Sequence, residues 1–101
     1  LGGGALRAYT VRARPLDDVV DELALTRLDV LKLDVEGAEY QVLHGARRTL
    51  GRFHPKLVVE VSSDKLAHMG GTADQLVSLI KELGYARSRQ VDEDDWEWTV
   101  R

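Results

Sequence analysis

Apolar residues recur along this chain at two different spacings. At the helical spacing of i, i+3, i+4 and i+7 they predict three amphipathic helices, near residues 16–25, 38–50 and 72–83. The first helix opens with Pro15, whose fixed φ suits a helix start. The last is the best defined, because Thr72 and Gln75 form a capping box and Gly84 follows as a stop signal.

Shorter apolar runs between these helices predict strands. In two of them, 28–35 and 57–61, apolar residues occupy both alternation sets, which is typical of strands that are buried on both faces. The segments 85–91 and 96–100 are separated by a short acidic turn, and they predict an antiparallel hairpin.

The predicted elements alternate along the chain. A strand-like segment at 9–13 comes first, a loop at 62–71 precedes the last helix, and the hairpin closes the chain. Strand–helix alternation with buried strands predicts an α/β fold in which helices cover a mostly parallel sheet. The antiparallel strand of the hairpin makes that sheet mixed. A chain of 101 residues is expected to form one domain at most.

Composition narrows the classes of protein. Hydrophobic residues make up 44% and charged residues 31%, and there is no cysteine, which excludes disulfides and thiolate metal sites. No apolar run approaches the ~20 residues of a membrane span, so we expect a cytoplasmic protein without a membrane partner. The local basic cluster of Arg47, Arg48 and Arg52 has no interleaved aromatic residues, so we expect no nucleic-acid partner.

Four carboxylates stand where strands are predicted to end. Asp34, Glu36 and Glu39 follow the apolar half of the stretch 29–39, and Glu60 ends the next buried strand. In α/β proteins ligands bind at the carboxyl ends of the strands. These acids are therefore the candidate site residues.

Other roles are open for the same acids. Asp34 shares a strand face with Lys32, which favours a local ion pair as much as a catalytic role. Glu36 and Glu39 stand at a helix start, where the helix dipole stabilises an acid by ~0.3–1 kcal/mol. A carboxylate cluster can also bind a hard divalent cation. No histidine has a supporting spacing, so we predict no metal site.

Several short motifs follow one another between residues 15 and 61. They are LDD at 16–18, LKLDVEGAE at 31–39, VL at 42–43 with GA at 45–46, and Pro55 with VVE at 58–60. In order and spacing, this set resembles the FkbM family of class I S-adenosylmethionine-dependent methyltransferases. The predicted closing helix and hairpin also suit the fold of that family.

The resemblance implies a place for each strand in the Rossmann-like methyltransferase sheet. Residues 29–35 would be the fourth strand, 57–61 the fifth, and the hairpin the sixth and seventh, giving the spatial order 4-5-7-6 with the seventh antiparallel. The first two strands, with the glycine loop and the ribose-binding acid of the family, have no counterpart in the sequence. The chain is thus expected to be the C-terminal half of one domain, with residues 1–14 displaced or flexible.

The resemblance also implies a function. The complete domain would be an O-methyltransferase that uses S-adenosylmethionine and acts on a hydroxyl of a secondary metabolite or sugar, and this chain would be its acceptor-side half. Asp34 and Glu36 are the predicted catalytic residues, Asp34 also contacts the cofactor, and Glu39 and Glu60 bind substrate. The chain alone is expected to be inactive and to bind the cofactor weakly. The alternative is a non-catalytic interaction module that forms a homo-oligomer through the free edge of the fourth strand.

Overall fold

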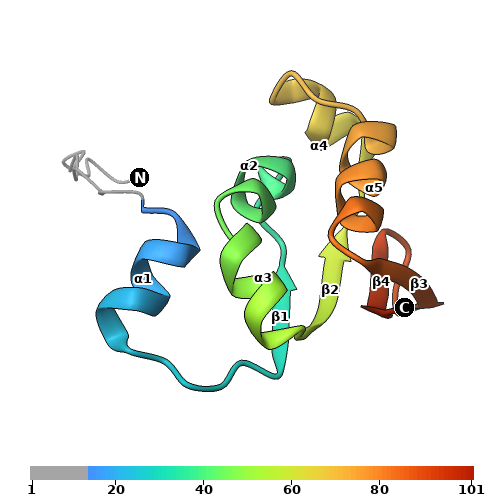
Figure 1. Cartoon of the computed structure of the whole chain (residues 1–101). Coiled ribbons are helices and arrows are strands. Elements are labelled where there is room, and N and C mark those ends of the chain that lie inside the picture. The colour runs from blue at the N-terminus through green and yellow to red at the C-terminus, as the bar shows by residue number, and fades with distance from the viewer. Residues whose placement is uncertain (1–13) are drawn as a thin grey trace, which may run out of the picture.

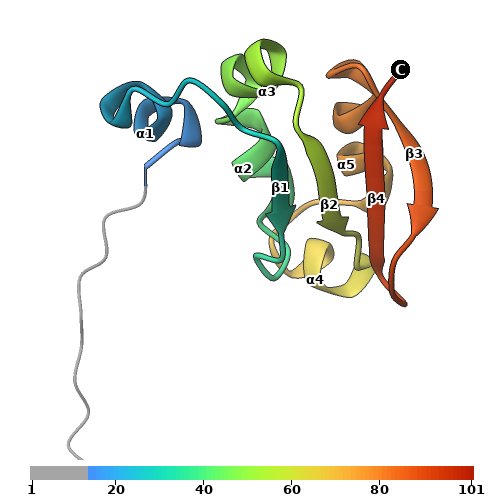
Figure 2. The ribbon, with the colours of Figure 1, turned by 90° about the horizontal axis from the view of Figure 1, so that it is seen from below.

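Four strands form one sheet, and most of the helices pack on one of its faces. The computed structural model describes residues 14–101. Its strands lie in the order β1-β2-β4-β3, and α2, α3 and α5 share one side of them (Figures 1 and 2). The elements are α1 (Leu16–Leu23), β1 (Val30–Leu33), α2 (Glu39–His44), α3 (Arg47–Phe53), β2 (Lys56–Glu60), α4 (Ser63–His68), α5 (Ala73–Glu82), β3 (Tyr85–Gln90) and β4 (Asp95–Val100).

The sheet is mixed. β1 and β2 run parallel, with Leu33 opposite Val59, whereas β4 runs antiparallel to both β2 and β3. The predicted α/β class, the terminal hairpin and the capped helix at 73–82 are therefore confirmed. Among the described residues the sheet is partly parallel and partly antiparallel, because one of its three strand pairs is parallel and the other two are antiparallel.

The core lies between the sheet and the helix layer. Leu33, Leu57 and Trp98 point from the strands toward the helices and are buried. Tyr85 is buried as well, and its hydroxyl donates to the Pro55 carbonyl at 2.6 Å. The helices contribute the remaining buried side chains, which include Leu43, Leu50, Leu66, Leu76 and Ile80. Within residues 14–101, no helix combines the length and the apolar character that a membrane crossing requires.

The prediction that the first strand is buried on both faces is wrong. β1 has four residues, and Leu33 on the helix side is buried, but Val30 is 55% exposed and Lys32 is exposed. The reason is that the helix layer covers only one face of β1 (Figure 2). Among the described residues, no element covers the opposite face.

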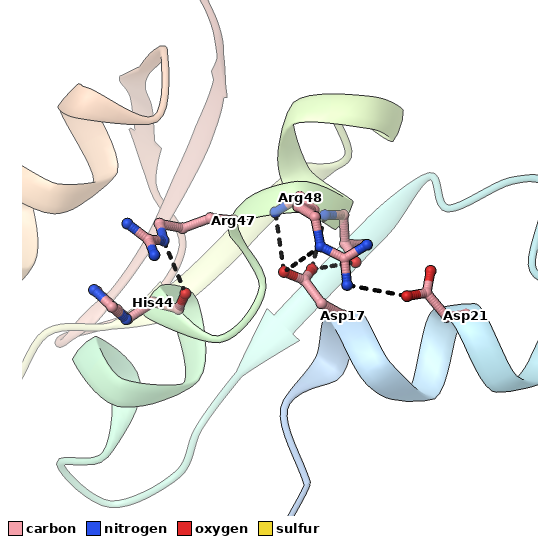
Figure 3. A network of polar contacts seen from close by, with 6 residues as sticks. Asp17, Asp21, His44, Arg47 and Arg48 are labelled. Atoms are coloured by element: carbon pink, nitrogen blue, oxygen red, sulfur yellow. Dashed lines mark hydrogen bonds and ion pairs between the residues drawn. The ribbon is translucent and has the colours of Figure 1, made fainter.

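The helix predicted at 38–50 is two helices, because the chain bends between α2 and α3 at Gly45 and Ala46. α3 has no side-chain cap of its own, and Asp17 from α1 supplies one (Figure 3). The Asp17 carboxylate accepts hydrogen bonds from the Arg48 amide at 3.1 Å, the Thr49 amide at 2.8 Å and the Thr49 hydroxyl at 2.7 Å. The cap from Asp17, more than thirty positions earlier in the sequence, thus allows α3 to begin as a separate helix.

A short helix, α4, stands where the sequence predicted only a loop. Ser62 caps it by accepting a hydrogen bond from the Lys65 amide at 3.4 Å, and Leu66 anchors it in the core. One turn and a half with a single buried side chain shows no helical period, which explains the error. α4 lies at the end of the sheet where β1 and β2 finish (Figure 2). The strand predicted at 9–13 falls outside the described residues.

Candidate functional site

The loop after β1 is held in an unusual backbone conformation. Glu36 has φ 54° and Gly37 has φ 100°, so two successive residues have positive φ. The left-handed region costs a residue with a side chain ~1–2 kcal/mol, which contacts elsewhere must offset. The Ala38 amide closes the turn by donating to the Val35 carbonyl at 3.2 Å.

Gly37 lets this loop lie directly against α4. A Cβ atom at this position would stand 2.2 Å from the carbonyl oxygen of Lys65, far inside van der Waals contact. The close approach and the positive φ independently require glycine here. The loop and α4 therefore form one unit at the carboxyl ends of β1 and β2.

Glu39 fixes the loop from the inside. Its side chain is buried, and its carboxylate accepts the Val35 amide at 2.9 Å and the Gly37 amide at 3.0 Å. Both oxygens are thus used within the loop. The predicted contact of Glu39 with substrate stays a prediction, and this geometry weighs against it.

The other three predicted acids come together. Carboxylate oxygens of Asp34, Glu36 and Glu60 lie within 4.8 Å of one another, and Asp34 and Glu36 are exposed. The Lys65 ammonium on α4 stands 3.0 Å from Glu36 and 3.1 and 3.2 Å from the two oxygens of Glu60. The alternative of a Lys32–Asp34 ion pair is not observed between these two described residues. We call Asp34, Glu36, Glu60 and Lys65 the acid cluster.

Charges within the acid cluster shift the pKa values of Glu60 and Lys65. Burial raises the pKa of Glu60, and the charges of Asp34 and Glu36 raise it further, while the hydrogen bond from Lys65 opposes the shift. The hydrogen bonds to Glu36 and Glu60 raise the pKa of Lys65, which keeps it an ammonium at neutral pH. Carboxylates this close can hold a cation or accept a proton. Here Lys65 supplies the positive charge, and we assign no metal ion.

Lys65 is the residue of this cluster that the sequence did not reveal. It lies five positions beyond Glu60 in a segment without helical period, so no local signal connected it to the acids. A cavity of about 190 Å³ adjoins the loop, lined in part by Gly37, Tyr40 and Leu66. The site therefore includes a loop, a strand end and a helix, together with a cavity.

A second cavity lies beside β1, next to α1 and α2. It is an apolar groove of about 490 Å³ between α1, β1 and α2, lined by residues that include Pro15, Leu16, Val19, Leu31 and Val42. Among the described residues, the edge of β1 that faces away from β2 has no partner strand. We call this surface the β1 groove.

Comparisons with known proteins identify a family and a relative. The family described as Methyltransferase FkbM domain matches residues 3–86. The chain is 36% identical over 85 residues to the AMB antimetabolite synthetase AmbE of Pseudomonas aeruginosa, and the match covers 84% of this chain but 4% of AmbE. No solved structure matches. The chain belongs to the FkbM methyltransferase family.

Proposed function

We propose that this chain forms the acceptor-side wall of an S-adenosylmethionine-dependent O-methyltransferase. The observation that carries the proposal is the convergence of Asp34, Glu36 and Glu60 at the carboxyl ends of β1 and β2. The proposed acceptor is a hydroxyl on a secondary metabolite or sugar. The similarity to an antimetabolite synthetase supports an acceptor of small-molecule type.

The assignment of strands supports this position for the site. We assign β1, β2, β4 and β3 to the fourth, fifth, seventh and sixth strands of the class I methyltransferase sheet. On this assignment the loop after β1 borders the crevice at the switch point of the sheet, where α/β proteins bind ligands. The glycine loop and the ribose-binding acid of the family belong to strands outside this set, and tight cofactor binding requires them.

The side chains of this wall suit a cationic methyl donor and a hydroxyl acceptor. Asp34 is exposed and its carboxylate forms no hydrogen bond or ion pair with the described residues, so a ligand can reach it. Asp34 accepts the proton of the acceptor hydroxyl and offsets positive charge, while Glu36 and Glu60 line the acceptor side. When bound, S-adenosylmethionine supplies the methyl group.

The proposal is tested with Asp34→Asn and Glu36→Gln in the complete methyltransferase domain. Methyl transfer from labelled S-adenosylmethionine should fall about 10²- to 10⁴-fold for Asp34→Asn, the range for loss of a general base, and less for Glu36→Gln. Glu93→Gln, in the exposed hairpin turn, is the matched control and should keep full activity. Full activity in Asp34→Asn would refute the assigned role.

Cofactor binding gives a second test. Residues 1–101 alone should show no heat of binding with S-adenosylmethionine in calorimetry, whereas the complete domain should bind it. Micromolar binding by residues 1–101 would contradict the requirement for the glycine loop.

A second candidate function is self-assembly through the β1 groove. The apolar groove and the unpaired edge of β1 favour it, because an open strand edge pairs readily with another chain. The proposed occupant is a second copy of this chain. Sedimentation of residues 1–101 should then show a dimer that Leu16→Glu converts to monomer. A strict monomer at high concentration would exclude this function.

A further inference from the structure

Lys65 connects the two elements that carry the candidate acids. Its ammonium contacts Glu36, on the loop after β1, and Glu60, at the end of β2. Its own carbonyl faces Gly37 of the same loop at the distance that excludes any Cβ atom. One residue of α4 thus touches both acids and the backbone between Asp34 and Glu39.

Lys65 contacts two of the three carboxylates in the acid cluster. Three carboxylate oxygens, two from Glu60 and one from Glu36, lie within hydrogen-bonding distance of its ammonium. Asp34 shares the cluster but has no hydrogen bond or ion pair with the described residues. Since Lys65 pairs with Glu36 and Glu60 and not with Asp34, Asp34 is the carboxylate left available to a ligand.

We propose that Lys65 is a positioning residue that holds Glu36 and Glu60 together and so leaves Asp34 as the acid that meets the ligand. This inference rests on the proposed methyltransferase function. Three carboxylates this close repel one another. Without the ammonium, the exposed Glu36 side chain moves away from Glu60. The loop that carries Asp34 then loses its side-chain contact with α4.

The ion pair between Lys65 and Glu60 is partly buried. The side chain of Glu60 is 12% exposed, whereas those of Lys65 and Glu36 are 39% and 70% exposed. Exposed ion pairs contribute little, but a buried carboxylate that loses its partner is strongly disfavoured. The effect of removing Lys65 should therefore arise mainly through Glu60.

The kinetic experiment compares Lys65→Met, Lys65→Arg and Lys81→Met in the complete domain. Lys65→Met should raise the KM for the methyl acceptor about 10-fold or more, since a misplaced group of this kind weakens ligand contacts. Lys65→Arg should restore it to within about 3-fold, because arginine can bridge the same two carboxylates. Lys81, exposed on α5, forms no ion pair among the described residues, and Lys81→Met should match wild type.

A purely structural role would give a different result. Partial unfolding lowers the concentration of active enzyme and leaves KM unchanged. An unchanged KM in Lys65→Met, or a failure of Lys65→Arg to restore it, would overturn the proposal.

A double-mutant cycle measured by thermal unfolding tests the contact between Lys65 and Glu60 without an activity assay. The Tm lost in Lys65→Met should be several degrees, and in a Glu60→Gln background the same change should cost clearly less. Equal Tm losses in the two backgrounds would overturn the proposal. If the wild-type domain transfers no methyl group while the cycle shows coupling, the proposed function fails and the link between Lys65 and Glu60 stands.

Discussion

Two acidic loops among residues 14–101 differ in how the fold supports them. The loop after β1 carries Asp34 and Glu36, is fixed from inside by buried Glu39, and lies against α4. The hairpin turn carries three consecutive acids at 92–94, which are exposed, and their carboxylates contact no basic side chain among residues 14–101. Both loops are rich in carboxylates, so acid content alone does not mark a site. The first loop differs in two ways. Its acids lie close to an acid from another element, and its backbone is held by buried contacts.

Of the variants that test this difference between the loops, Gly37→Ala should lose the most stability. The added Cβ meets the Lys65 carbonyl and the residue must keep a positive φ, so we expect a loss of about 3 kcal/mol or more in the free energy of unfolding, measured with urea. Gly84 is the matched control, with φ +94° and no atom within 4 Å of its Cβ position. Gly84→Ala should cost only about 1–2 kcal/mol, the penalty of the positive φ alone. Equal losses would show that the loop does not depend on its contact with α4.

Glu39→Gln should have the next largest effect. The amide group keeps one acceptor but places an NH₂ group against a backbone N–H in a buried site, and an unsatisfied buried donor costs about 1–3 kcal/mol. Glu93→Gln, in the hairpin turn, makes the same chemical change and should stay within about 0.5 kcal/mol of wild type. If urea unfolding gives the two variants the same stability, Glu39 does not hold the loop.

Asp17→Ala tests the long-range cap of α3, with an expected loss of about 1–2 kcal/mol at pH 7. Burial alone would raise the pKa of Asp17, but the hydrogen bonds from Thr49 and Arg48 and the charge of Arg48 outweigh it, so the pKa is lowered. The carboxylate therefore stabilises the fold above the unfolded pKa near 3.8, and this contribution disappears as pH falls through the lower folded value. Unfolding curves at pH 7 and pH 2 should show the difference from wild type shrinking at pH 2. A difference that persists at pH 2 would mean that packing, and not the charged cap, is lost.

Asp94→Asn should have the smallest effect. The side chain is exposed in the hairpin turn, and the backbone carbonyl that accepts the Val61 amide is unchanged. We expect a change within about 0.5 kcal/mol in urea unfolding and no change in methyl transfer by the complete domain. A large loss of activity would place the hairpin turn in the site and remove the contrast between the two loops.

The sequence by itself determined the features that short-range periodicity encodes. The helix at 16–23, the capped helix that begins after Thr72 and the antiparallel hairpin are each specified by residues close together in the chain. The same is true of the acids at the strand ends, because an apolar run followed by carboxylates is visible without a structure. The family motifs lie in these same segments.

Only the tertiary structure decided what those acids do. The sequence predicted a substrate contact for Glu39, with a role at the helix start as the alternative, but its buried side chain accepts the loop amides. Lys65, from a helix that the sequence did not predict, pairs with Glu36 and Glu60. The helix break beside Gly45 depends on Asp17 in the same way. Local pattern fixes which face of an element is apolar. Burial, charge pairing and a distant cap depend on contacts between elements, and no local spacing encodes those contacts.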